Sequence, residues 1–141
     1  MSRIYWDTVL FAYWLEDRRE YAPRLQQIFE KMTERGDTLC TSAYTVGELL
    51  LGPRKVGALD VVQQIRDFFR TPAMRVLPFT EETGERYARI RVEQQVSAAD
   101  AIHLATAAQA NVDVFLTADR RLLGLMVPGI QFIAGMDVNL F

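Results

Sequence analysis

The apolar residues of the chain fall into short runs and into longer segments with helical spacing. The short runs are rich in β-branched and aromatic residues, which is typical of strands, and they predict strands at residues 4–6, 38–42, 75–79, 112–117 and 130–133. The helical spacing predicts helices at residues 9–17, 24–36, 44–52, 58–70, 81–94, 97–110 and 120–126. Gly36 would end the second of these helices, and Gly52-Pro53 the third.

This alternation of strands and helices predicts an α/β fold. Such chains form a mostly parallel sheet, here of about four to five strands, with helices on both faces. The 141 residues, half of them apolar, suffice for a single domain over residues 1–141 with one hydrophobic core. We find no repeats or linkers that would mark a second domain.

Composition excludes several classes of protein. The single cysteine, Cys40, excludes an intrachain disulfide and a zinc site built from cysteines, and it suits a reducing cytoplasm. The N-terminus lacks the pattern of a signal peptide, and no apolar run approaches the roughly twenty residues that span a bilayer, so we expect a cytoplasmic protein without membrane contact. The net charge of −2 means that a nucleic-acid partner would need a local basic patch or a bound cation.

Acidic residues follow the predicted strands at one edge of the sheet. Asp7 and Asp119 come directly after strands, Glu48 lies in the helix after residues 38–42, and Asp100 stands at the start of the helix at 97–110. Ligands bind beyond the carboxyl ends of parallel strands, so we expect these four carboxylates to meet there. Clustered carboxylates repel unless a cation is bound, and oxygen ligands select Mg²⁺ or Mn²⁺.

Each acid also has a purely structural interpretation. Ser97 and Asp100 have the spacing of a capping box, Asp7 or Thr8 would cap the first helix, and Asp119 has the position of an N-cap. Glu48 would complete a capping box if Thr45 is the cap; if Ser42 is the cap, Glu48 lies well inside the helix, and the sequence supports both. The placement of all four acids at one edge favours the metal site.

Three other α/β classes with a ligand at this edge do not fit. A receiver domain needs a lysine after a late strand, but the only lysines are Lys31 and Lys55. A phosphatase of the haloacid dehalogenase type needs a second aspartate at position 9, where Val9 stands. A dinucleotide site needs a glycine-rich first turn, which is missing after residues 4–6.

Four segments together resemble a known family. IYWDT (4–8), TVGELLLG (45–52), SAADAIHLATA (97–107) and FLTADRRL (115–122) are similar, in this order, to PIN-domain ribonucleases, and most closely to the VapC-type toxins of bacterial toxin–antitoxin pairs. The two C-terminal segments together are specific, whereas DT and GELL alone are not. The resemblance covers essentially the whole chain and implies a PIN-like α/β domain.

The resemblance implies metal-dependent cleavage of RNA at this acidic edge. Asp7, Asp100 and Asp119 would bind Mg²⁺ or Mn²⁺ directly or through water, and Glu48 would bind the metal or orient the attacking water. Thr8 and Thr117 match the hydroxyl residues beside the first and last acids and would support the site by donating to the ligand carboxylates or to the phosphate. Many relatives carry a further acid where this chain has Arg121, which bears on the number of metals. We also consider four basic residues as contacts for the RNA backbone: Arg54, Lys55, Arg120 and Arg121.

By the same resemblance, the partners would be RNA, a cognate antitoxin and a second copy of the chain in a homodimer. Phe11, Tyr13, Trp14 and the leucines at 49–51 are either core residues or part of the groove that receives the antitoxin. For His103, the only histidine, we expect a packing role. Two alternatives to a toxin stay open: a PIN nuclease of RNA processing, and a catalytically inactive protein-binding module.

Overall fold

A five-stranded parallel sheet organises the computed structural model, which describes residues 1–139. The strands are β1 (Arg3–Trp6), β2 (Thr38–Ser42), β3 (Met74–Leu77), β4 (Val114–Thr117) and β5 (Phe132–Gly135), in the order β3-β2-β1-β4-β5. Every neighbouring pair is parallel. The predicted α/β class, parallel sheet and helix-covered faces are confirmed.

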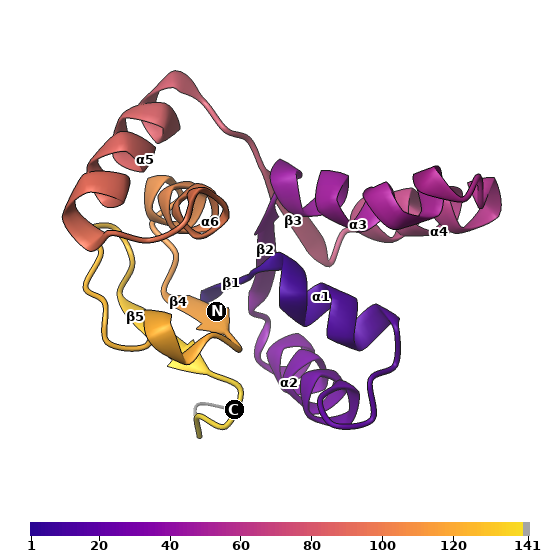
Figure 1. Cartoon of the computed structure of the whole chain (residues 1–141). Coiled ribbons are helices and arrows are strands. Elements are labelled where there is room, and N and C mark those ends of the chain that lie inside the picture. Colours follow the sequence, from indigo (N-terminus) through magenta and orange to yellow (C-terminus); the bar gives the residue numbers. More distant parts are fainter. Residues whose placement is uncertain (140–141) are drawn as a thin grey trace.

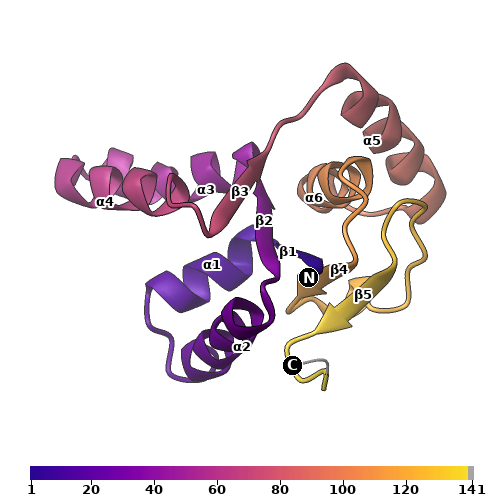
Figure 2. The same cartoon turned by 180° about the vertical axis from the view of Figure 1, so that it is seen from behind.

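The helices divide between the two faces of the sheet, as Figures 1 and 2 show from opposite sides. On one face lie α1 (Thr8–Leu15), α2 (Ala22–Arg35), α3 (Ala43–Lys55) and α4 (Leu59–Phe69), and on the other lie α5 (Glu81–Gln94) and α6 (Ala98–Gln109). Residues along β1 alternate accordingly: Ile4 and Trp6 enter the core beneath α1 and α2, and Tyr5 enters the core beneath α6.

The helix α6 is buried nearly all round, as its apolar sequence predicts. Seven of its residues, from Ala101 to Ala108, are buried, and it packs between the sheet and α5. Close packing also explains why residue 129, in the turn before β5, is a glycine. Its φ of +101° favours glycine, and an added Cβ would lie 2.6 Å from the Ala108 carbonyl oxygen.

Several predicted boundaries are wrong. Pro53 does not end the third helix, which continues to Lys55; a proline in the last turn removes only one hydrogen bond, and Gly57, with a φ of +67°, marks the real exit. The helix expected at 120–126 is only the 3₁₀ turn η1 (Arg120–Leu122), because the Asp119 carboxylate tightens the chain there by accepting from Arg121 N.

Two strands are also displaced from their predicted ranges. β3 ends at Leu77, before Pro78, which cannot donate a hydrogen bond to the sheet, and β5 lies two residues later than expected. No helix within residues 1–139 has the length and apolar character needed to cross a bilayer.

Candidate active site

The candidate site lies where the strand order of the sheet changes direction. From β1 the chain builds outward through β2 and β3, and it then returns to the other side of β1 to form β4 and β5. The carboxyl ends of β1 and β4 are therefore neighbours, with Trp6 opposite Leu116. In open α/β sheets this switch point is where ligands bind, and it brings Asp7 beside Thr117.

Asp7 is the buried acid of this site and also the N-cap of α1. Its Oδ1 accepts from Leu10 N at 3.4 Å, its Oδ2 accepts from the Thr117 hydroxyl at 2.9 Å, and only 8% of the residue is exposed. Burial raises the pKa of Asp7 to about 6, against the opposing effect of these two hydrogen bonds, and the charges of Asp100 and Asp119 raise it further. The capping interpretation was thus correct, but it leaves the carboxylate charge without a cation.

Asp100 reaches the same place from the start of α6. The Ser97 hydroxyl caps the helix by accepting from Asp100 N at 3.2 Å. The reciprocal half of a capping box, from the Asp100 carboxylate back to Ser97 N, does not form, and this carboxylate accepts no hydrogen bond from residues 1–139. Asp100 is half-buried and acts electrostatically on Asp7, so capping does not account for its carboxylate.

Asp119 already has a cation partner in the chain itself. Its two carboxylate oxygens accept from Nε and Nη2 of Arg121 at 3.1 and 2.7 Å, and these hydrogen bonds lower the pKa of Asp119. Asp100 also attracts the exposed Arg121 guanidinium, whose pKa is raised mainly by Asp119. Where many relatives would add an acid, this chain therefore places a positive charge beside two of the acids.

Thr117 links the first and last acids. Its hydroxyl donates to Asp7 Oδ2 and accepts from Asp119 N at 3.0 Å. Thr117 thus contacts both acids, and its role beside a metal stays a prediction. A buried hydroxyl with both functions used holds the two acids in a fixed relation.

Glu48 stands apart from these acids in the described contacts. Ser42 is the N-cap of α3, accepting from Tyr44 N, so Glu48 lies inside the helix with no capping role. Its carboxylate accepts a hydrogen bond from Tyr44, which raises the pKa of that phenol. No contact described within residues 1–139 joins Glu48 to Asp7, Asp100 or Asp119, so a role for Glu48 at the site stays a prediction.

His103 is buried, which confirms the packing role, but its polar contacts were not predicted. Nδ1 shares a hydrogen bond of 2.7 Å with the Tyr5 hydroxyl, and Nε2 shares one of 3.1 Å with Thr8 Oγ1. Burial lowers the pKa of His103 to about 4, so the ring is neutral at pH 7 and donates at only one nitrogen. Thr8, predicted to support the acids, instead anchors the start of α1 to α6. In the sequence, only the three-residue spacing between Asp100 and His103 indicated that His103 lies near the acids.

Comparison with known proteins identifies the family of the chain. The sequence model described as PIN domain matches residues 4–125, which is most of the chain. The chain belongs to the PIN domain family. This is a family of nucleases, and the match includes all four acids of the predicted site. No curated protein sequence matches this PIN domain.

Solved structures share the fold of this PIN domain at low sequence identity. A toxin–antitoxin complex from Klebsiella pneumoniae has a chain with 22% identity and a TM-score of 0.70, covering 90% of this chain and 94% of that chain. VapBC2 from Rickettsia felis bound to a promoter DNA fragment has a chain with 15% identity and a TM-score of 0.74, and the match covers 94% of this chain and 98% of that chain. DNA-bound VapBC from Salmonella typhimurium has a chain with 22% identity and a TM-score of 0.73, and the match covers 96% of this chain and 99% of that chain.

The donors at the switch point of the PIN domain suit a hard divalent cation. Carboxylate and hydroxyl oxygens are the ligand type that Mg²⁺ and Mn²⁺ prefer. A cation would offset the burial of the Asp7 charge, which is the main cause of its raised pKa, and also its repulsion by Asp100 and Asp119. Within residues 1–139, however, no three Asp, Glu, His or Cys side chains lie close enough to hold one metal ion together. Repulsion and the Arg121 contact both act against such a closed cluster.

The four basic candidates of the PIN domain are not brought together. Arg120 and Arg121 lie in η1, directly beyond the acids. Arg54 and Lys55 lie in the last turn of α3, about 18 Å along the helix from Ser42, since an α-helix rises about 1.5 Å per residue. Figure 1 shows this end of α3 far from β4 and η1, so only the η1 pair is placed beside the acids.

Proposed function

We propose that this PIN domain is a Mg²⁺- or Mn²⁺-dependent endoribonuclease and the toxin of a VapBC-type toxin–antitoxin pair. The observation that carries the proposal is the buried Asp7 carboxylate at the switch point, joined through Thr117 to the backbone of Asp119. A buried carboxylate with a raised pKa and two acidic neighbours weakens the fold, and such groups cluster at functional sites.

In this proposal each acid binds the metal or positions the attacking water. Asp7, Asp100 and Asp119 would hold the metal directly or through bound water, and Glu48, from α3, would bind the metal or orient the attacking water. When bound, the metal lowers the pKa of that water and neutralises charge on the scissile phosphate. Thr117 keeps Asp7 in position through its 2.9 Å hydrogen bond, and Thr8 fixes the start of α1 through His103.

A groove on the opposite side of α1 supports an antitoxin partner. Its cavity of about 260 Å³ lies between α1, α3 and α4 and has an apolar lining. Leu15 and Val61, which border it, are 41% and 37% exposed, whereas Phe11 is fully buried and belongs to the core. The structural neighbours from Rickettsia felis and Salmonella typhimurium were solved as VapBC complexes. We propose that an amphipathic antitoxin segment occupies this groove and that the toxin forms a homodimer.

The first experiment measures Mn²⁺ binding and RNA cleavage by the purified chain, freed of any antitoxin, and by two variants. Asp100→Asn removes the carboxylate charge but retains its size. Ser97→Ala is the matched control, because it removes the hydroxyl that caps α6 and leaves the acid in place. We expect Asp100→Asn to lose saturable Mn²⁺ binding and cleavage with little change in Tm.

Ser97→Ala should keep Mn²⁺ binding while losing about 1 kcal/mol of stability, as is usual for a lost N-cap. The opposite pattern, with unchanged Mn²⁺ binding in Asp100→Asn and a large fall in its Tm, would make Asp100 a structural residue. Absence of Mn²⁺ binding by the wild type at millimolar concentration would refute the proposed metal-dependent activity.

A further inference from the structure

A second cavity adjoins the acids on the side of β4 and β5. It measures about 580 Å³, within the size range of ligand sites, and its lining includes Thr117 and Ala118 at the end of β4 and Gly135 to Asp137 at the end of β5. Thr117 is thus shared between this cavity and the acidic centre, because its hydroxyl donates to Asp7. The cavity and the acidic centre are therefore neighbours, with Thr117 between them.

Two stacked tyrosines form its opposite wall. The rings of Tyr13 and Tyr21 lie 4.2 Å apart between centroids with an interplanar angle of 11°, and the Arg18 guanidinium lies 5.4 Å from the centre of the Tyr13 ring. Both tyrosines line the cavity and are half-buried. Half-exposed, stacked aromatic rings provide a surface on which an unpaired nucleobase can stack.

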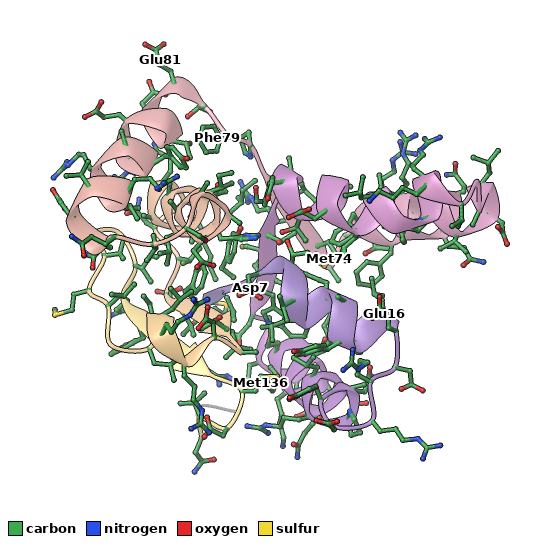
Figure 3. All side chains as sticks on the ribbon, in the orientation of Figure 1. Asp7, Glu16, Met74, Phe79, Glu81 and Met136 are labelled. Atoms are coloured by element: carbon green, nitrogen blue, oxygen red, sulfur yellow. The ribbon has the colours of Figure 1, made fainter. Side chains whose placement is uncertain are left out.

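The wall formed by residues 136–138 is fixed to α2. Arg24 donates from Nε to the Met136 carbonyl at 2.8 Å and from Nη2 to the Val138 carbonyl at 2.9 Å. Met136 packs against the core cluster beneath α1 and α2, and Figure 3 shows it between β5 and these helices. The cavity is therefore preformed, and a ligand need not order this segment.

Asp137 supplies a hydrogen-bond acceptor in this lining. Its Oδ1 lies over Gly135, only 3.0 Å from where a Cβ of that residue would stand, so the carboxylate folds back over the end of β5. It lines the main cavity and a neighbouring one of about 310 Å³, which also shares Tyr21 and Met136. Arg120 borders the main cavity from η1 and supplies a positive charge.

We propose that this cavity is a single-nucleotide subsite that binds a guanine of single-stranded RNA next to the phosphate held at the acids. Guanine presents two adjacent N–H donors on its Watson–Crick edge, which match the two oxygens of the Asp137 carboxylate. Tyr21 stacks with the base, and Arg120 contacts the adjoining backbone. The subsite deepens the proposed ribonuclease function and rests on it.

The test measures binding without cleavage. Fluorescence anisotropy in EDTA compares labelled single-stranded UUGUU with UUAUU and UUIUU, in which inosine lacks one of the two donors of guanine. The wild type should bind UUGUU at least about fivefold more tightly than UUAUU, with UUIUU in between, since losing one paired donor at a buried site costs part of the discrimination.

Two variants assign this preference to the cavity. Tyr21→Leu keeps apolar bulk but removes the stacking surface, so its affinity for UUGUU should fall about tenfold. Asp137→Asn should bind UUGUU and UUAUU almost equally. The matched controls are Tyr87→Leu, which removes another tyrosine lying near an arginine, and Asp60→Asn at the start of α4; both should bind like the wild type.

Equal binding of UUGUU and UUAUU by the wild type, or no binding of any oligonucleotide, would overturn the subsite. So would unchanged affinity in both Tyr21→Leu and Asp137→Asn. These outcomes are independent of the nuclease proposal, which is tested by Mn²⁺ binding and cleavage with Asp100→Asn. Binding of UUGUU that persists while the wild type neither binds Mn²⁺ nor cleaves RNA would retain the subsite and refute the nuclease.

Discussion

The sheet carries aspartates at both of its edges, and their surroundings differ. At the amino edge, Asp37 precedes β2 and accepts from Ser2 N at 2.7 Å, with the N-terminal ammonium at 3.0 Å and Arg35 at 3.5 Å. Asp113 precedes β4 and accepts from Arg3 N at 2.7 Å. At the carboxyl edge, Asp7 is buried without a cation, and Asp100 adds a second negative charge.

The pKa values follow this difference. Burial alone would raise the pKa of Asp37, but the hydrogen bond from Ser2 and the positive charges outweigh it and lower the pKa. For Asp7 burial prevails, and the pKa rises to about 6. A carboxylate that stabilises the fold is surrounded by donors and cations, whereas one that costs stability is retained for another reason. A position directly beside a strand does not distinguish a stabilising carboxylate from one that costs stability.

The same substitution at the two edges should therefore have opposite effects. Asp7→Asn keeps a side chain that can cap α1 but removes the buried charge. We expect cleavage to fall at least about 100-fold, since the proposed metal ligand is lost, and the free energy of unfolding at pH 7 to rise by roughly 1–3 kcal/mol. Activity assays and thermal melts measure both; a lower Tm at pH 7 would contradict the assignment.

Asp37→Asn provides the counterpart. It removes the charge that pairs with the N-terminus and Arg35, and we expect a loss of about 1–3 kcal/mol of stability with unchanged cleavage below the melting transition. Chemical denaturation of the chain with its native N-terminus measures this loss. A decrease in specific activity as large as that of Asp7→Asn would remove the distinction between the two edges.

The pH dependence isolates the contribution of Asp7. Its folded-state pKa is raised, so the folded protein binds this proton more tightly than the unfolded chain, and the stability from Asp7 declines as pH rises from about 4 to 6. The Tm of Asp7→Asn should exceed that of the wild type above pH 6, and the difference should vanish below about pH 4. His103 acts oppositely, because its lowered pKa reduces stability as pH falls, but it is common to both proteins. A pH-independent difference would disprove the raised pKa.

Arg121 should give the smallest effect. Its guanidinium is 83% exposed, so its pairing with Asp119 is weak, and its removal should tighten Mn²⁺ binding only about threefold. Arg121→Gln tests this by titration with Mn²⁺, and Arg121→Lys, which retains the charge, is the control. Weaker Mn²⁺ binding in Arg121→Gln would indicate that Arg121 positions Asp119 rather than competing with the metal.

The sequence was sufficient to predict the sheet and the neighbouring strand ends at which Asp7 and Asp119 lie. The spacing and length of the apolar runs identified five strands. The parallel arrangement of these strands then placed Asp7 and Asp119 at neighbouring strand ends. The sequence was insufficient where the structure depends on contacts between residues that are far apart in the chain. The hydrogen bonds of Arg24 to residues 136–138 and of His103 to Thr8 have no signature in local spacing. The stacking of Tyr13 on Tyr21 depends on the turn between α1 and α2, which the apolar pattern does not define. Two helix ends depended on single residues: Asp119, whose carboxylate accepts from Arg121 N, and Gly57, whose φ is +67°.

The bond between Thr117 and Asp7 joins residues 110 positions apart. Ribosomal synthesis therefore produces Asp7 well before Thr117. Until residues 114–117 have been made, β1 has no β4 beside it, and the Asp7 carboxylate lacks the hydroxyl donor of Thr117. A nascent or truncated chain that stops before Thr117 therefore cannot form the bond that holds Asp7 and the Asp119 segment together.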